Sequence, residues 1–337
     1  MSETAAEALV GRSDYRSPIL ALPGAVPVPE GPDMGVALHY GDPLREQRRL
    51  VAGEGFVDLS HRGVLRVSGP ERLSWLHSLT SQHLSQLEPG VGTEALVLSP
   101  HGHVEAHMRV LDDGTSTWLT LEPGTGAGLR AYLESMRFWA QVEVADLSDE
   151  VAVLWQPRSS PQPGLLSWVC PPRGGSAGAL AGRELLVPRD RLEAVLSRAG
   201  QPAGLWSMEA LRLAAASPRF GFETDHRTIP HEVGWIGAAV HLDKGCYRGQ
   251  ETVARVHNLG RPPRRLVLLH LDGSTGELPG HAAVIEHEGR PVGVLGTAVH
   301  HFELGPIGLG LVRRSVPTEA TLHLGRVSAA QEVVVPA

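Results

Sequence analysis

The sequence predicts an α+β protein that ends in a small antiparallel β-barrel. Helical and strand-like patterns alternate between about residues 55 and 260, whereas the chain beyond Pro262-Pro263 carries short strand-like runs alone. With 337 residues, 42% of them hydrophobic and 20% charged, the chain has an ordinary globular composition and enough length for two or three domains. We therefore divide it into an N-terminal arm (1–42), a main region (43–261) and a C-terminal barrel (262–337).

The N-terminal arm is rich in proline and glycine, which predicts an extended segment with little secondary structure. Its first residues, Met1-Ser2-Glu3-Thr4, are acidic and lack an apolar segment, so no signal peptide is expected. Two cysteines in a chain of this length exclude a disulfide scaffold, and no apolar run reaches the length of a membrane span. We expect a cytoplasmic protein without membrane contact.

The main region contains both kinds of pattern. Period-two runs predict strands over 63–69, 93–99 and 103–111. Apolar residues at helical spacing predict helices that start near Pro70 and that span 127–138, 190–199 (capped by Gly200) and 207–216. Residues 157–182 hold five prolines among glycines and serines, which predicts a mobile loop.

The C-terminal region contains six short strand-like runs with turn residues between them, as in a small barrel. These runs are 266–271, 283–287, 291–297, 308–312, 320–324 and 332–335. Glu288-Gly289 predicts a hairpin between the second and the third.

The strongest chemical signal is Cys246, in the run Lys244-Gly245-Cys246-Tyr247-Arg248-Gly249-Gln250-Glu251. Lys244 is the only lysine among 30 basic residues, which suggests a place where a flat guanidinium cannot replace a compact ammonium. Lys244 and Arg248 put two cations beside the thiol, and a helix predicted from Gln250 would further favour the thiolate. We therefore select Cys246 and Lys244 as the candidate reactive residues. The alternative is a buried structural cysteine.

This run, continued by Thr252-Val253-Ala254-Arg255, resembles the signature of the YgfZ family. These folate-binding proteins are linked to iron–sulfur cluster assembly and repair and to tRNA modification, and are related to mitochondrial iron–sulfur assembly factors. The wider relative is the aminomethyltransferase, or T-protein, of the glycine cleavage system. Weaker similarity covers roughly residues 44–330 and includes 55–60, 211–216 and 230–232. The resemblance implies an aminomethyltransferase-like folate-binding fold, with antiparallel sheets flanked by helices and a C-terminal β-barrel, and tetrahydrofolate as its ligand.

Two departures from the transferase pattern bear on activity. Ala106-His107 stands where aminomethyltransferases carry a pair of aspartates, and Ala214 stands where they carry a glutamate that grips the pterin. A neutral histidine does not supply a fixed anion at pH 7. The resemblance therefore favours a folate-binding factor that supports iron–sulfur assembly proteins or client enzymes through Cys246, rather than a classical enzyme. A folate-dependent aminomethyltransferase or demethylase is the alternative.

Folate binding requires an apolar slot for the ring, polar groups for the pterin edge and cations for the glutamate tail. The candidate contacts are His107 and Glu209 as acceptors, Phe222, Trp235 and Tyr247 as the slot, Arg212 and Arg255 as cations, and Gln250 and Glu251 from the cysteine motif.

A weaker alternative is a metal-binding module built on the histidine-rich stretch 101–107. If this stretch is extended, His101, His103, Glu105 and His107 share one face and form a ligand set for zinc or iron. One strand rarely closes a metal site, so no metal is assigned. The net charge of −7 argues against direct nucleic-acid binding, so we expect any link to tRNA to run through the modifying enzymes, and we expect a monomer.

Overall fold

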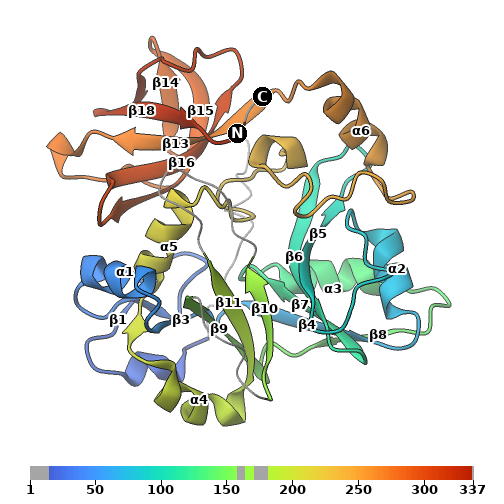
Figure 1. Cartoon of the computed structure of the whole chain (residues 1–337). Coiled ribbons are helices and arrows are strands. Elements are labelled where there is room, and N and C mark those ends of the chain that lie inside the picture. Colours follow the sequence, from blue (N-terminus) through green and yellow to red (C-terminus); the bar gives the residue numbers. More distant parts are fainter. Residues whose placement is uncertain (1–14, 158–163, 171–180, 336–337) are drawn as a thin grey trace.

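The structure, a computed structural model, describes residues 15–157, 164–170 and 181–335 (Figure 1). Two five-stranded sheets form the main region, and a closed six-stranded barrel forms the C-terminal region. Both the mixed α and β content and the C-terminal antiparallel barrel predicted from the sequence are confirmed.

The first sheet is antiparallel, in the order β5-β6-β7-β4-β8. Its strands are β4 (Gly63–Ser68), β5 (Gly92–Leu98), β6 (Val104–Asp112), β7 (Ser116–Leu121) and β8 (Glu143–Asp146). One face buries residues such as Val97, Met108 and Leu119 in a core shared with α2 (Arg72–Leu79) and α3 (Gly126–Ser135). Helix α2 begins two residues after Pro70, and α3 ends at Ser135, shortly before Phe138 adopts a left-handed φ of 43°.

The second sheet has the order β10-β11-β9-β3-β12 and pairs strands that are far apart in the sequence. Its strands are β3 (Phe56–Asp58), β9 (Val151–Pro157), β10 (Leu166–Cys170), β11 (Gly182–Pro188) and β12 (Pro202–Ala203). The prediction of a loop over 157–182 is wrong at β10, which pairs with β11 and buries Trp168. Residues 158–163 and 171–180 of that predicted loop lie outside the described residues.

Helices α1 (Pro43–Val51), α4 (Leu192–Ala199) and α5 (Leu205–Ala214) contact strands of the second sheet. The 3-10 turn η2 (Arg189–Arg191) leads into α4. Gly200 caps α4 with a φ of 87°, as predicted. The described part of the N-terminal arm has only the turn η1 (Pro18–Ala21) and the short strands β1 (Val26–Pro27) and β2 (Ala37–His39). Nevertheless, it buries Ile19 and Val36 against the main region.

The barrel closes in the order β13-β16-β15-β14-β17-β18. Its strands are β13 (Arg264–Leu271), β14 (Val284–His287), β15 (Arg290–His301), β16 (Gly305–Arg313), β17 (Leu322–Leu324) and β18 (Val327–Val333), with the turn η4 (Gly273–Thr275) after β13. Each predicted run overlaps one strand, although β18 starts earlier than expected. Glu288 and Gly289 form the predicted hairpin with φ values of 50° and 71°, the left-handed pair that a tight two-residue turn requires.

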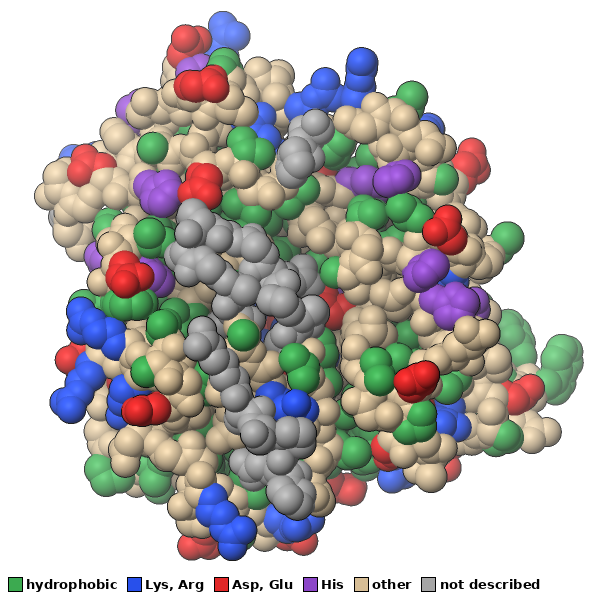
Figure 2. All heavy atoms as spheres, in the orientation of Figure 1, with side chains coloured by type: hydrophobic (Ala, Val, Ile, Leu, Met, Phe, Trp, Pro, Cys, Tyr) green, Lys and Arg blue, Asp and Glu red, His purple; other side chains and the backbone are tan. Residues whose placement is uncertain are grey.

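The turn η3 (Pro230–Val233) and helix α6 (Gln250–Leu259) connect the main region to the barrel. On the face shown in Figure 2, acidic and basic side chains are interspersed rather than gathered into patches of one sign. Among the described residues, no helix combines the length and the apolar character needed to cross a bilayer.

Candidate functional site

A buried polar layer lies between the two five-stranded sheets. Register pairs Glu94 of β5 with Arg109 of β6, and Arg109 with Thr120 of β7, so these side chains share the sheet face opposite the helices. His107, two residues before Arg109, lies on the same face. Glu184 of β11 reaches this face from the second sheet, 3.2 Å from Nε of Arg109 and 3.3 Å from the Thr120 hydroxyl. A sheet face that is buried but charged makes this layer the leading site candidate.

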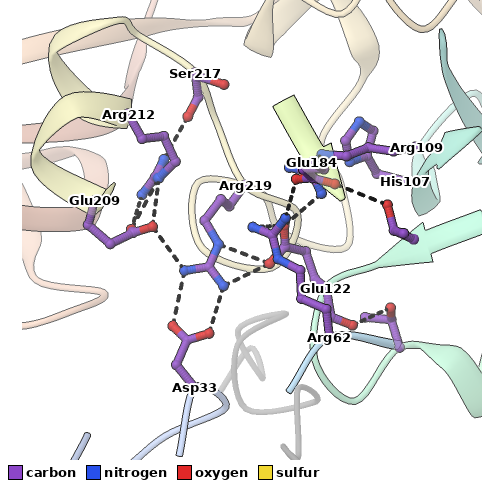
Figure 3. A network of polar contacts seen from close by, with 12 residues as sticks. Asp33, Arg62, His107, Arg109, Glu122, Glu184, Glu209, Arg212, Ser217 and Arg219 are labelled. Atoms are coloured by element: carbon purple, nitrogen blue, oxygen red, sulfur yellow. Dashed lines mark hydrogen bonds and ion pairs between the residues drawn. The ribbon is translucent and has the colours of Figure 1, made fainter. Parts of the chain in front are cut away.

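Arg219, which follows α5, is fully buried at the centre of this layer (Figure 3). Its guanidinium donates to both oxygens of Asp33 (2.8 and 3.0 Å), to Glu122 (2.7 and 2.9 Å) and to Glu209 (3.1 Å), and lies 3.9 Å from the ring centroid of Phe222. Burial alone raises the pKa of Asp33 and Glu122, but Arg219 and its neighbours more than offset this, so both pKa values are held well below their usual range. The three carboxylates in turn outweigh burial and raise the pKa of Arg219.

Two further arginines extend the layer toward the first sheet. Arg62 lies 2.7 Å from Glu184 and 3.5 Å from Glu122, and Arg109 lies 3.2 and 3.6 Å from the same two carboxylates. Each guanidinium therefore bridges two buried acids, so the charges of the layer are held as one connected set (Figure 3).

Glu209 and Arg212, both predicted folate contacts, lie on α5 and already have partners. Arg212 donates to both oxygens of Glu209, to Glu223 (2.8 Å) and to the hydroxyl of Thr297 on β15 (3.1 Å). Arg212 is 4% exposed, and its contacts join α5 to the barrel. Its assignment to a ligand tail remains a prediction, and the structure adds a role in holding the barrel to the main region.

His107 and Trp235, two more predicted contacts, lie against one another. The two rings are stacked at an interplanar angle of 1° with centroids 4.6 Å apart, and Nε2 of His107 lies 2.9 Å from a carboxylate oxygen of Glu94. All three side chains are buried. The indole Nε1 of Trp235 has no hydrogen-bond partner among the described residues. An unpartnered buried donor is costly, so a ligand with a polar edge would be stabilised here.

Cys246 lies exposed in the loop that precedes α6. Helix α6 begins at Gln250, as predicted, after Gly249 with a φ of 81°. A side chain at Gly249 would come within 2.5 Å of the Ser99 carbonyl and 3.0 Å of Gly102, so the glycine allows this loop to pack against the turn at residues 99–102.

The other predicted residues of this motif divide between core and surface. Tyr247 is buried in the same hydrophobic core as Trp235, and burial raises its pKa to about 12. Arg248 is exposed and lies 3.1 Å from Glu105. Glu251 and Arg255 are exposed on α6, and Gln250 donates to the backbone oxygen of Lys244 at 3.5 Å.

Lys244 is 4% exposed and anchors this loop to α2. Its ammonium donates to the backbone carbonyls of His77 and Thr80 at the end of that helix, and lies 5.0 Å from the ring centroid of Tyr247. Burial lowers its pKa to about 8. The structure thus gives the lone lysine an anchoring role; its influence on the thiol remains a prediction.

The shared face expected for the histidine-rich stretch is not formed. A bulge shifts the register so that Val97 pairs with Ala106 whereas Leu98 pairs with Val104, and Glu105 is the unpaired residue. Glu105 is therefore exposed while His107 is buried. Within residues 15–157, 164–170 and 181–335, no three His, Cys, Asp or Glu side chains are arranged to hold a metal ion.

Sequence reasoning missed most of the buried layer. The residues it missed are Asp33, Arg62, Glu94, Arg109, Glu122, Glu184 and Arg219. They come from widely separated segments, so no local spacing connects them. The one local signal is that Glu94 and Arg109 interrupt otherwise apolar strand runs, but such alternation is also what a solvent-facing strand shows.

No family model matches the chain. It is similar to the aminomethyltransferase of Synechococcus sp. strain CC9902, with 25% identity over 292 residues, 77% of this chain and 79% of that relative. The aminomethyltransferase of Nostoc sp. strain PCC 7120 is 28% identical over 308 residues, with 82% and 81% coverage. A putative chloroplastic transferase of Arabidopsis thaliana is 27% identical over 287 residues, 77% of this chain and 65% of that protein.

Among solved structures, the glycine cleavage system aminomethyltransferase T from Bartonella henselae superimposes with a TM-score of 0.76 and 19% identity, covering 93% of this chain and 94% of that one. The chain therefore has the aminomethyltransferase-like fold, with the C-terminal barrel expected from the sequence, and it is similar in sequence to aminomethyltransferases.

Proposed function

We propose that the chain binds a reduced folate in the buried polar layer and supports iron–sulfur proteins through Cys246. The observation that carries the folate proposal is the flat His107–Trp235 stack, in which the buried indole N–H lacks a partner among the described residues. A pterin is flat and has polar edges, so these residues fit it: Trp235 offers a donor, and the Glu94–His107 pair offers an acceptor. Bound tetrahydrofolate would accept or supply a one-carbon unit.

The proposed role of the thiol rests on its exposure and on the fixed position of its loop. Lys244 and Tyr247 are buried on either side of Cys246, so the loop is held while the thiol remains accessible. An exposed thiol can reach a cluster, a persulfide donor or a partner protein, whereas a buried one cannot. We therefore propose iron–sulfur assembly proteins or their client enzymes as partners.

A second candidate function is folate-dependent aminomethyl transfer or demethylation, and Glu94 is the observation that favours it. The carboxylate of Glu94 lies 2.9 Å from His107, so an acid is present in the layer although Ala106-His107 replaces the aspartate pair. The absence of a hydrogen-bond acceptor at Ala214 argues against this second candidate. Formation of methylene-tetrahydrofolate from an aminomethyl donor, at rates that depend on Glu94, would favour this candidate over the first.

The folate proposal is tested by titrating the full chain with tetrahydrofolate in a calorimeter. We expect binding at micromolar or weaker affinity. Trp235→Phe should weaken tetrahydrofolate binding, because the substitution keeps the ring stack and removes the N–H donor. Trp139→Phe is the matched control, because Trp139 is 95% exposed. Absence of binding at millimolar tetrahydrofolate would contradict the proposal.

The thiol proposal is tested separately in cells that depend on this chain for iron–sulfur enzyme activity. Cys246→Ala should fold and bind tetrahydrofolate as the wild type does, yet fail to restore that activity. Cys170→Ser serves as the control for loss of a thiol as such. Full restoration by Cys246→Ala would leave the folate proposal standing and remove the proposed role of the thiol.

A further inference from the structure

A second cavity lies outside the buried polar layer, between residues 221–227 and the barrel. Its volume is about 360 Å³, and strands β14, β15 and β16 line its other side. This volume is near the lower end of the range for small-molecule sites. The cavity therefore has room for a small ligand. Phe222, a predicted folate contact, lines it, whereas the His107–Trp235 stack and Cys246, on which the proposed functions rest, do not.

Two backbone features shape this cavity. A side chain at Gly296 would come within 2.7 Å of both the Phe222 carbonyl and the Glu223 side chain, so the glycine lets residues 221–227 lie directly against β15. Ala282, at the cavity wall, has a φ of 61°, which is unfavourable for a residue other than glycine. Its amide donates to the Leu295 carbonyl at 3.0 Å, which holds this conformation. Strained backbone of this kind is enriched at ligand sites.

Three arginines line the cavity, and one of them is already neutralised. Arg264 and Arg313 are opposite one another on β13 and β16 and so share a face. Arg264 pairs with Asp225 at 2.6 Å and with Glu232 at 2.7 Å. Arg313 and Arg227 are exposed, and neither guanidinium has an ion pair or hydrogen bond with a described residue. Because Arg264 is already neutralised by two acids, an anion that enters the cavity would be held by Arg227 and Arg313 rather than by Arg264.

The remaining wall is part polar and part apolar. Its two acids, Glu223 and Asp225, are paired with Arg212 and Arg264. Val284 is 50% exposed and Val294 is 46% exposed, although both are large aliphatic side chains, and Pro291 lies beside them. Phe222 adds an aromatic wall; its ring centroid is 5.9 Å from that of His281. Apolar side chains next to unpaired guanidinium groups match a ligand that has an anionic group and an apolar body.

We infer that this cavity binds a small carboxylate with an apolar body. The guanidinium groups of Arg227 and Arg313 hold the carboxylate, and Val284, Val294 and Pro291 cover the body. The inference is independent of the proposed folate function, since none of these residues belongs to the buried polar layer.

The test is calorimetric titration of the full chain with 4-phenylbutanoate, its neutral analogue 4-phenylbutanol and inorganic phosphate. We expect saturable binding of the acid at millimolar or lower concentration. The alcohol should bind at least about tenfold more weakly, because a hydrogen bond between two charged groups contributes that much. Phosphate should also bind at least about tenfold more weakly, because it lacks the apolar body that Val284 and Val294 cover. Arg227→Ala and Arg313→Ala should each weaken acid binding about tenfold. Arg326→Ala, at an exposed site on the same barrel outside the cavity, should not change it.

Tetrahydrofolate binding in the Arg227→Ala/Arg313→Ala double variant should equal that of the wild type, which keeps the two ligand sites distinguishable. Both side chains are exposed and unpaired within the described chain, so the double variant should unfold at the wild-type urea concentration. The inference is overturned if the acid does not bind saturably, if the alcohol or phosphate binds as tightly as the acid, or if the double variant binds the acid with unchanged affinity.

Discussion

Replacing Arg219 with alanine removes a buried guanidinium from three carboxylates at once. Breaking a single buried ion pair typically costs about 3–5 kcal/mol, because the remaining charge is left in a poorly solvated place. Asp33, Glu122 and Glu209 all contact Arg219, so we expect a loss of about 5 kcal/mol in the free energy of unfolding at pH 8.

The loss should depend on pH in a definite direction. In the wild type, the pKa values of Asp33 and Glu122 lie below their ordinary values, so the stability that these groups contribute is lost only as the pH falls below about 4. Without Arg219, burial is offset only by Arg62 and Arg109 at Glu122 and by His61 at Asp33, so both native pKa values should rise. A carboxyl group whose native pKa is raised favours the native state at low pH, so the variant should lose stability as the pH rises from 5 to 8.

Urea unfolding followed by tryptophan fluorescence at pH 5, 6.5 and 8 measures this difference. Arg219→Met, which retains much of the side-chain volume, separates the effect of charge from that of a cavity, and Arg326→Ala is the surface control. The reasoning would be refuted by a loss below about 1 kcal/mol at pH 8, or by equal losses at pH 5 and pH 8.

Four other substitutions test three single residues. Burial lowers the pKa of Lys244 from 10.5 to about 8, so the native state releases this proton at a lower pH than the unfolded state does. In urea unfolding, the wild type should therefore gain stability relative to Lys244→Met between pH 8 and 10.5. Parallel plots of unfolding free energy against pH for the two proteins would exclude this. Lys244→Arg should be less stable than the wild type at pH 7 because the flat fork does not fit the same two carbonyls. Burial, and then His257, lower the pKa of His231 from 6.5 to about 4, so the wild type should lose stability as the pH falls across that window and His231→Gln should lose less. Phe138 is 75% exposed with a φ of 43°, so Phe138→Gly should keep or raise the melting temperature; a clear drop would show that its side chain contributes to stability.

The barrel was predictable because its strands are local. Each run of alternating residues is bounded by turn residues, and the hairpin at Glu288-Gly289 is encoded by two neighbouring positions. Strand β10 was missed because its evidence is not local: it lies between proline-rich segments, and its stability comes from pairing with β11 and from burial of Trp168. The described part of the arm was likewise expected to have little structure, and it has little, but Asp33 ties it to Arg219.

The candidate site likewise has a part that local sequence predicts and a part that depends on contacts between distant segments. The exposed Cys246 and the helix that starts at Gln250 follow from eight consecutive residues and were expected. The buried layer is assembled from the arm, both sheets and the segment after α5, and its members become neighbours only when the two sheets face one another. The prediction that His101, His103, Glu105 and His107 share one face of the strand failed because of a one-residue bulge at Glu105. Strand register depends on pairing with the neighbouring strand, which the local sequence does not reveal.

The choice between arginine and lysine at the buried positions of this chain follows the arrangement of the oxygen atoms that each side chain binds. In the buried layer, Arg219 and Arg62 each span separate carboxylates, for which the five donors of a wide guanidinium are better suited than a compact ammonium. Lys244 instead donates to two carbonyls that converge on one point at the end of α2, where a compact ammonium fits. Because this anchor lies two residues before Cys246, a defect of Lys244→Arg in iron–sulfur support can arise from a displaced loop alone. Only Cys246→Ala, which leaves the anchor intact, tests the chemistry of the thiol.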